Sequence, residues 1–296
     1  MNNEDAIKQK FTEWKEYLEG KEPPKIDPNS ICGVLYSLFW EMGAYESYVA
    51  ICKGNPKSPL ATLLFGNLTA YNYIQVQAIR IRRLCEPSSS ANEIKDTSVY
   101  SLRRIVDELK QQRKAGLLTR ENLCAAYGIP PSMQEVTRQF PEATSGISGS
   151  FSTDSIVAGN IHTMLDNICD KNGLKKSLTD ELDKRLLVDK NTQLSEIVYF
   201  VDKHIVHSAS DDSRKQLGIE LALRVADMKK VIQDITEVFF CCNMLIAQAD
   251  TEIITIGWED KLANLNKDEV ATTHAVFDGI KEESKAWKQT GYGLLK

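Results

Sequence analysis

The sequence predicts an all-α protein, built as an up-down helical bundle with a central helical insertion and a C-terminal extension. Apolar residues recur every three or four positions along most of the 296 residues, and this spacing places them on one face of a helix. Prolines, glycines and clusters of small polar residues separate the periodic segments, as is usual at helix ends. Two long helices in the first third and two in the last third would form the bundle, and the less regular middle would be the insertion.

Five parts are expected from these patterns. They are an N-terminal helix and linker in 1–28, the first half of the bundle in 30–112, the insertion in 113–190, a motif helix and a long closing helix in 191–248, and the extension in 249–296. Because the chain has no internal repeat, each part is predicted from its own pattern.

The first half of the bundle contains two long apolar segments and a short one. One helix should cover about 30–53, and a second should run from Pro59 to Glu86, because proline suits a first helical turn. The buried face of the second helix would consist of Leu60, Leu64, Leu68, Tyr71, Ile74, Ala78, Ile81 and Cys85. A shorter helix should follow at about 98–113.

The insertion has weaker sequence signals for where helices begin and end. Thr119 is expected to cap a short helix that ends at Gly128. The segment 143–153, rich in glycine and serine, has the composition of a flexible loop. Helices are expected after it at about 154–171 and 176–188.

The last third has the clearest periodicity. A helix should cover 192–207, and the polar cluster 208–212 should cap a long helix that reaches about residue 248. The apolar positions of that long helix are Leu217, Leu221, Val225, Met228, Ile232, Ile235, Phe239, Cys242 and Ile246. Their near-heptad spacing predicts a packing seam against neighbouring helices or against a second subunit. A short strand is conceivable at 251–258, and a final helix should cover about 266–287.

Composition excludes several classes of protein. With 42% hydrophobic and 26% charged residues, the chain has ordinary globular usage and is not disordered as a whole. Its net charge of −5 gives it no general attraction to nucleic acid, so RNA binding would require a local basic patch.

The cysteines and the apolar runs indicate an intracellular location. Seven cysteines are scattered without a CxxC pair, which argues against a disulfide framework, a structural zinc site and a metal cofactor. The start of the chain has no apolar run typical of a signal peptide, and the longest such run, Val238–Ala247, is too short to cross a bilayer. We therefore expect a cytoplasmic protein without a membrane segment.

One short segment could carry chemistry. In an α-helix, Lys203 and His207 would share a face opposite the apolar stripe, and His204 would lie at its border. A histidine can exchange protons with a ribose hydroxyl near neutral pH, and a neighbouring cation can stabilise charge on the phosphate. Alternatively, both side chains are solvated and simply complement the dipole at a helix C-terminus. His204 and His207, with Asp211 nearby, are too few ligands for a metal site.

The order Asp202-Lys203-His204-Ile205-Val206-His207 resembles the signature of the HEPN superfamily (higher eukaryotes and prokaryotes nucleotide-binding domains). This signature has an arginine, then Asn, Asp or His, a short gap, and a histidine at the end of a bundle helix. A second similarity lies upstream, in Arg82-Arg83-Leu84-Cys85-Glu86-Pro87 and the later Ser101-Leu102-Arg103-Arg104-Ile105. Both resemble the abortive-infection-related branch of that superfamily, over roughly 30–112 and 190–248.

The resemblance implies a HEPN-like bundle and a metal-independent endoribonuclease of a defence or toxin system, acting as a homodimer around a shared cleft. Its catalytic residues would be Asp202, Lys203, His204 and His207, and Arg82, Arg83 and Arg103 would bind RNA or a nucleotide. One departure is that Val201 stands where the family arginine is expected, so that Lys203 would have to replace it.

Other functions stay open. The departure favours a catalytically inactive HEPN-like module that binds RNA, a nucleotide or a protein partner. A helical interaction protein with accidental motif similarity is a third interpretation. The cations Arg80, Arg82, Arg83, Arg103, Arg104, Arg113 and Lys114 form either a solvated face or the local phosphate-binding patch that an acidic RNA-binding protein would need.

Overall fold

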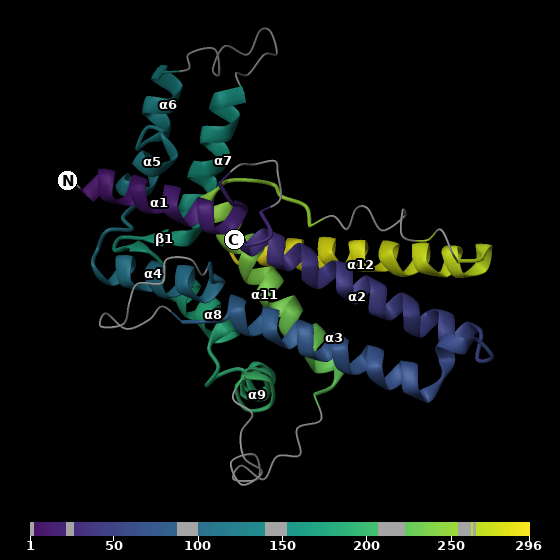
Figure 1. Cartoon of the computed structure of the whole chain (residues 1–296). Helices are drawn as coiled ribbons and strands as arrows, with labels where there is room; N and C mark the ends of the chain where they lie inside the picture. Colours follow the sequence, from purple (N-terminus) through teal and green to yellow (C-terminus); the bar gives the residue numbers. More distant parts are fainter. Residues whose placement is uncertain are drawn as a thin grey trace.

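The structure is a computed structural model, and it describes residues 3–21, 27–87, 100–139, 153–206, 223–253, 262 and 265–296. Helices dominate these residues, as the apolar periodicity predicts (Figure 1). The helical elements are α1 (Asn3–Glu19), α2 (Ile31–Gly54), the 3₁₀ turn η1 (Pro59–Ala61), α3 (Leu63–Leu84), α4 (Leu102–Lys114), α5 (Arg120–Tyr127), α6 (Met133–Gln139), α7 (Thr153–Ile168), α8 (Lys176–Leu186), α9 (Thr192–Phe200), the π-helical segment η3 (Val201–Val206), α11 (Val225–Ile246) and α12 (Lys267–Gly293). The described strands are β1 (Cys169–Asp170) and β2 (Gly173–Leu174).

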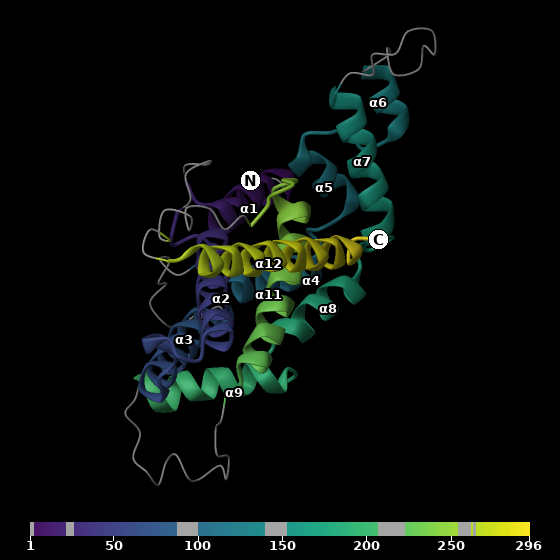
Figure 2. The ribbon, with the colours of Figure 1, turned by 90° about the vertical axis from the view of Figure 1, so that its right-hand side faces the viewer.

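Helix α11 forms the centre of the core. It packs against α12, α9, α1, α3 and α8, and α12 crosses it at a steep angle (Figure 2). The seam residues Met228, Ile232, Ile235, Phe239 and Cys242 are all 0% exposed. The predicted packing seam is therefore confirmed from Met228 onward, and neighbouring helices of the same chain cover it rather than a second subunit.

The predicted closing helix is not continuous through Leu223 and Arg224. Arg224 has an extended backbone (φ −94°, ψ 142°) and precedes the first helical residue, Val225, so a helix starting near residue 213 is wrong at this point. Val225 itself is only half-buried, unlike Met228 and the later seam residues. The expected cap cluster 208–212, Leu217 and Leu221 lie outside the described residues.

The α2–α3 hairpin differs from its prediction in two ways. Ser58 and Thr62 both act as N-caps, accepting hydrogen bonds from the backbone N–H groups of Leu60 and Phe65. A 3₁₀ turn and a helix therefore replace one continuous helix. The predicted buried face is also only partly buried, because Ala78 and Ile81 are enclosed but Leu64 remains 75% exposed. In Figure 1, α2 lies between α3 and α12, and the three helices extend together to one side of the molecule.

In the insertion, the predicted helix caps are confirmed and a hairpin is new. Thr119 accepts from the N–H of Asn122, and Gly128 closes α5 with φ 68°. The helix expected to reach residue 171 ends at Ile168, where β1 pairs with β2 through an antiparallel hairpin. Gly173 is required there, since it has φ 92° and a Cβ would lie 2.2 Å from the carbonyl oxygen of Leu118.

The C-terminal extension consists mainly of α12. A capping box formed by Asn266 and Glu269 starts this helix, and it continues to Gly293, beyond the predicted end at residue 287. The possible strand at 251–258 is absent from residues 251–253, and the remainder lies outside the described residues. Among the helices described, none is long and apolar enough to cross a membrane.

Candidate functional site

The two sequence segments that carry the resemblance meet in space. The Arg82 Nε at the end of α3 donates to the Asp202 Oδ1 in η3 at 2.6 Å, across a sequence separation of 120 residues. Each of these side chains is about one-third exposed, and the Arg82 Nη1 lies 3.5 Å from the Glu86 Oε1. The structure thus brings a predicted substrate-binding residue to a predicted catalytic residue.

The motif itself lies on a π-helical turn rather than an α-helix. Helix α9 ends at Phe200, and the backbone widens over Val201–Val206. Since π-helical hydrogen bonds link residues five apart instead of four, the expectation that positions 203 and 207 share a face no longer follows. His207 lies outside the described residues. Short π-helical turns within helices occur frequently at functional sites.

The neighbours of Asp202 in η3 point into different surroundings. Val201 is 1% exposed and belongs to the hydrophobic core, so the position where the resemblance leads us to expect an arginine faces the interior. The exposed ring of His204 stacks on Phe200 at a centroid distance of 5.3 Å. Lys203 is half-buried. The polar residues of η3 that the structure describes are therefore Asp202, Lys203 and His204, which are all at least partly exposed.

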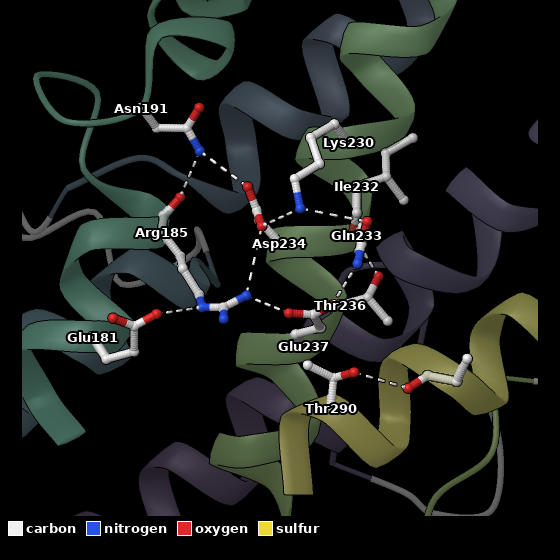
Figure 3. A network of polar contacts seen from close by, with 11 residues as sticks. Glu181, Arg185, Asn191, Lys230, Ile232, Gln233, Asp234, Thr236, Glu237 and Thr290 are labelled. Carbon is white, nitrogen blue, oxygen red and sulfur yellow. Dashed lines mark hydrogen bonds and ion pairs between the residues drawn. The ribbon is translucent and has the colours of Figure 1, made fainter. Parts of the chain in front are cut away.

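Helix α9 is held at its start by a polar network that the sequence analysis missed (Figure 3). Asn191 caps α9 by accepting from the N–H of Leu194, and its side-chain amide donates to the carbonyl oxygen of Arg185 at 3.1 Å and to Asp234 at 3.3 Å. Arg185 in turn pairs with Glu237, whose side chain is 2% exposed. This network links α8 and α11 to the start of α9, the helix that leads into the motif.

Arg83 has different partners from Arg82. Its Nη2 donates to the carbonyl oxygen of Asn29 at 3.1 Å and to the Asn29 Oδ1 at 3.4 Å. It therefore ties the end of α3 to the turn that precedes α2. Arg83 follows Arg82 in α3 and so lies near the candidate site, but Arg82 is the residue that contacts Asp202.

Arg103 is not part of the site. It is 7% exposed, and its guanidinium pairs with Asp107 and with Asp183, the latter at 2.8 Å. Asp183 also meets Lys110 at 2.8 Å. Burial opposes ionisation of Asp183, but Lys110 and Arg103 outweigh it and lower the pKa of this carboxyl. Because its guanidinium is already paired with two carboxylates in this buried network between α4 and α8, we do not retain Arg103 among the substrate-binding residues.

The predicted basic patch is not one continuous surface. Arg104 pairs with Glu108 at 2.9 Å, and the Arg113 Nε donates to the carbonyl oxygen of Leu174 at 2.8 Å. Arg80 pairs with Glu41 of α2. The guanidinium groups of Arg103, Arg104 and Arg113 in α4 thus serve contacts within the chain, whereas Arg82 of α3 contacts the motif.

Metal and thiol chemistry find little support in the part of the chain that the structure describes. Within these residues no group of three or more His, Cys, Asp or Glu side chains could hold a metal ion. Burial raises the pKa of Cys85 and of Cys242 to about 12, so these thiols stay protonated and pack as small hydrophobic groups.

One cavity in the described part of the chain lies elsewhere. It has a volume of about 400 Å³ and is lined by α7, the end of α11 and the end of α12, including Ile161, Met164, Met244 and Tyr292. In Figure 2, α7 and the C-terminal end of α12, which supply most of these residues, lie away from α9. Arg82 and Asp202 do not line this cavity.

Comparisons with known proteins find no counterpart: no family model, no curated protein and no solved structure matches the chain.

Proposed function

We propose that the chain is a HEPN-like, metal-independent endoribonuclease of a defence or toxin system, with its site between the end of α3 and the η3 turn. The observation that carries this proposal is the 2.6 Å contact between the Arg82 Nε and the Asp202 Oδ1. It places a guanidinium beside the motif, although position 201 of the motif holds a buried valine. Arg82 would then replace the arginine that the resemblance leads us to expect, a better substitute than Lys203.

The contact orients the guanidinium for phosphate. Asp202 engages Nε, whereas the terminal Nη1 meets only the longer contact of 3.5 Å with Glu86. A phosphate can displace such a weak, partly exposed partner and accept two parallel hydrogen bonds from the terminal nitrogens. A lysine could offer only a point charge at the same place.

The proposed reaction is transesterification within RNA. The ribose 2′-oxygen bonds to the adjacent phosphorus, the bond to the 5′-oxygen breaks, and a 2′,3′-cyclic phosphate and a 5′-hydroxyl result. His207 would accept the 2′-hydroxyl proton and return a proton to the leaving 5′-oxygen, and Arg82 would stabilise the charge on phosphorus. The role of His207 rests on its place in the sequence motif.

A second candidate is a module that binds RNA, a nucleotide or a protein partner without cleaving it. The burial of Val201 and the pairing of Arg82 with two carboxylates favour it, because both reduce the positive charge available at the site. In that case Arg82 and Asp202 mainly hold α3 against η3.

RNA cleavage by purified protein separates these candidates. With a fluorescent single-stranded RNA in excess chelator, wild-type protein should produce fragments that end in a 2′,3′-cyclic phosphate. His207→Ala should abolish cleavage, Arg82→Ala should reduce it at least 100-fold, and Arg82→Lys should restore only part of it. Arg83→Ala is the matched control, since this neighbouring guanidinium binds Asn29 instead.

Three outcomes decide between the interpretations. If wild-type protein cleaves no RNA and its expression does not arrest bacterial growth, the nuclease proposal fails. RNA binding that Arg82→Ala weakens and Arg83→Ala preserves would then support the binding module. Absence of both cleavage and binding would leave a helical interaction protein.

A further inference from the structure

Exposed apolar side chains gather on the α2–α3 hairpin. Of the eleven large hydrophobic residues that are exposed in the described part of the chain, eight lie between residues 60 and 79. They are Leu60, Leu63, Leu64, Phe65, Leu68, Tyr71, Val76 and Ile79. Leu63 is 80% exposed and Leu64 75%, values unusual for leucine in an isolated globular chain. Contiguous apolar surfaces of this kind mark interaction sites.

Four of these residues, Leu64, Leu68, Tyr71 and Ile79, form one face of α3, which we call the α3 face. Leu64, Leu68, Tyr71 and Ile79 are spaced by helical repeats and so align along one side of the helix. Arg82 lies three residues after Ile79 and continues the same line. The opposite side of α3, with Tyr73, Gln77 and Ile81, is buried against the chain. The α3 face therefore leads directly from the tip of the hairpin to the candidate site.

The α3 face carries no charge. Between Lys57 and Arg80 the sequence contains no Asp, Glu, Lys, Arg or His. In a two-fold symmetric contact a surface must match itself, so any charge near the axis would meet its own copy. A surface without positive or negative charges avoids this repulsion, and it offers a charged partner no group with which to form an ion pair. This property favours a second copy of the chain as the occupant.

The α3 face supplies part of the area that a dimer interface needs. From Leu64 to Ile79 it extends roughly 22 Å at 1.5 Å per residue, and its exposed side chains offer on the order of several hundred Å² of apolar area. A standard interface buries about 800 Å² from each partner. Hollows of about 330 Å³ and 360 Å³ between α2 and α3 flank this face and can accept side chains from a partner.

We propose that a second copy of the chain covers the α3 face in an antiparallel, two-fold symmetric contact. The charges at the ends of α3 determine the orientation. Arg80, Arg82 and Arg83 all lie at the C-terminal end, so a parallel pair would bring six cations together and align the two helix dipoles. An antiparallel pair keeps the two groups of arginines apart and lets the two helix dipoles oppose each other.

This arrangement has a consequence for the candidate site, which rests on the function proposed above. With Leu64 opposite Ile79 of the other copy, the two-fold axis passes near Tyr71 and Asn72, and the two copies of Arg82 lie roughly 30 Å apart. Each site would then be completed by the other copy's α3 N-terminal end. The two sites would act separately instead of sharing one cleft.

Light scattering tests the dimer without any reference to RNA. Wild-type protein at micromolar concentration should have twice the chain mass of 33.3 kDa. Tyr71→Glu should give a monomer with an unchanged helical circular dichroism spectrum, because this side chain is already 56% exposed. Met133→Glu is the matched control, at an apolar residue that is 47% exposed on α6, and it should remain dimeric. A wild-type monomer overturns the proposal, including one that binds lipid vesicles or another protein.

Cysteine cross-linking under mild oxidation tests the orientation. Tyr71→Cys should cross-link to itself, and Leu64→Cys should cross-link when mixed with Ile79→Cys but not alone. Wild-type protein controls for native thiols such as Cys52, which lines one of the hollows. Efficient self-cross-linking of both Leu64→Cys and Ile79→Cys would show a parallel pair and overturn the antiparallel contact. Loss of RNA cleavage in a dimeric protein would leave the contact standing and reject only the proposed function.

Discussion

At the scale of single residues, Val201 occupies a core position where the resemblance leads us to expect an arginine. Its side chain is 1% exposed within the core. Val201→Arg should therefore destabilise the protein by several kcal/mol, because it buries a charge without a partner. Thermal unfolding measures this loss. Gln193→Arg, at an exposed position of α9, should leave the midpoint nearly unchanged. A Val201→Arg protein as stable as wild type would mean that this position faces solvent.

Phe239 tests the core seam in the same way. Its ring is 0% exposed and lies against Phe240 at a centroid distance of 5.4 Å. Phe239→Ala should lower the free energy of unfolding by about 3–5 kcal/mol, through lost burial and the cavity left behind. Phe65→Ala, at a phenylalanine that is 47% exposed, should cost much less. Urea titrations compare the two, and equal losses would contradict the assigned packing of α11.

At the scale of elements, the placement of α9 depends on one amide. Asn191 both caps the helix and joins Arg185 to Asp234. Asn191→Ala should reduce the free energy of unfolding by about 1–2 kcal/mol, measured by urea titration. The neighbouring Thr192→Ala, at an exposed position, is the control. If Asn191→Ala is as stable as its control, the network does not hold α9.

Local signals explain which elements could be predicted. Caps and breakers act within a few residues, so Thr119, Gly128 and the end of α2 at Gly54 were predicted correctly. The η3 turn could not be predicted, because Val201 and Ile205 continue the apolar stripe that an α-helix would also show. Helical spacing alone therefore cannot reveal a change to wider turns.

Long-range contacts could not be predicted from the sequence, for a different reason. The pairing of Arg82 with Asp202 spans 120 residues, and no local pattern specifies which of several arginines meets a given carboxylate. Arg103, predicted with Arg82 as a ligand for RNA, instead neutralises buried Asp183. The apolar stripe of α3 likewise predicted burial, but periodicity does not say whether the covering surface belongs to the same chain.

At the scale of the whole molecule, buried ion pairs join helices that are distant in sequence. Glu108 of α4 accepts from the Trp14 Nε1 of α1 at 2.7 Å and meets the Lys10 Nζ at 2.8 Å. Burial opposes ionisation of Glu108, but Lys10, Trp14 and Arg104 outweigh it, and its pKa is lowered. Asp183 links α4 to α8 with the same result. Carboxylates thus connect α1, α4 and α8 into one unit.

These lowered pKa values predict how stability depends on pH. A carboxyl whose pKa is lower in the folded state than in the unfolded chain stabilises the fold above its unfolded value, roughly pH 4. That contribution is lost as the pH falls through the lower folded value, because the unfolded chain then binds more protons. The urea midpoint should therefore fall as the pH decreases from about 5 to 3. Asp183→Asn and Glu108→Gln should each be less stable at pH 7 and show a shallower decline, whereas Asp180→Asn, at an exposed position of α8, should follow wild type. A wild-type midpoint that stays constant down to pH 3 would show that these ion pairs do not stabilise the folded chain.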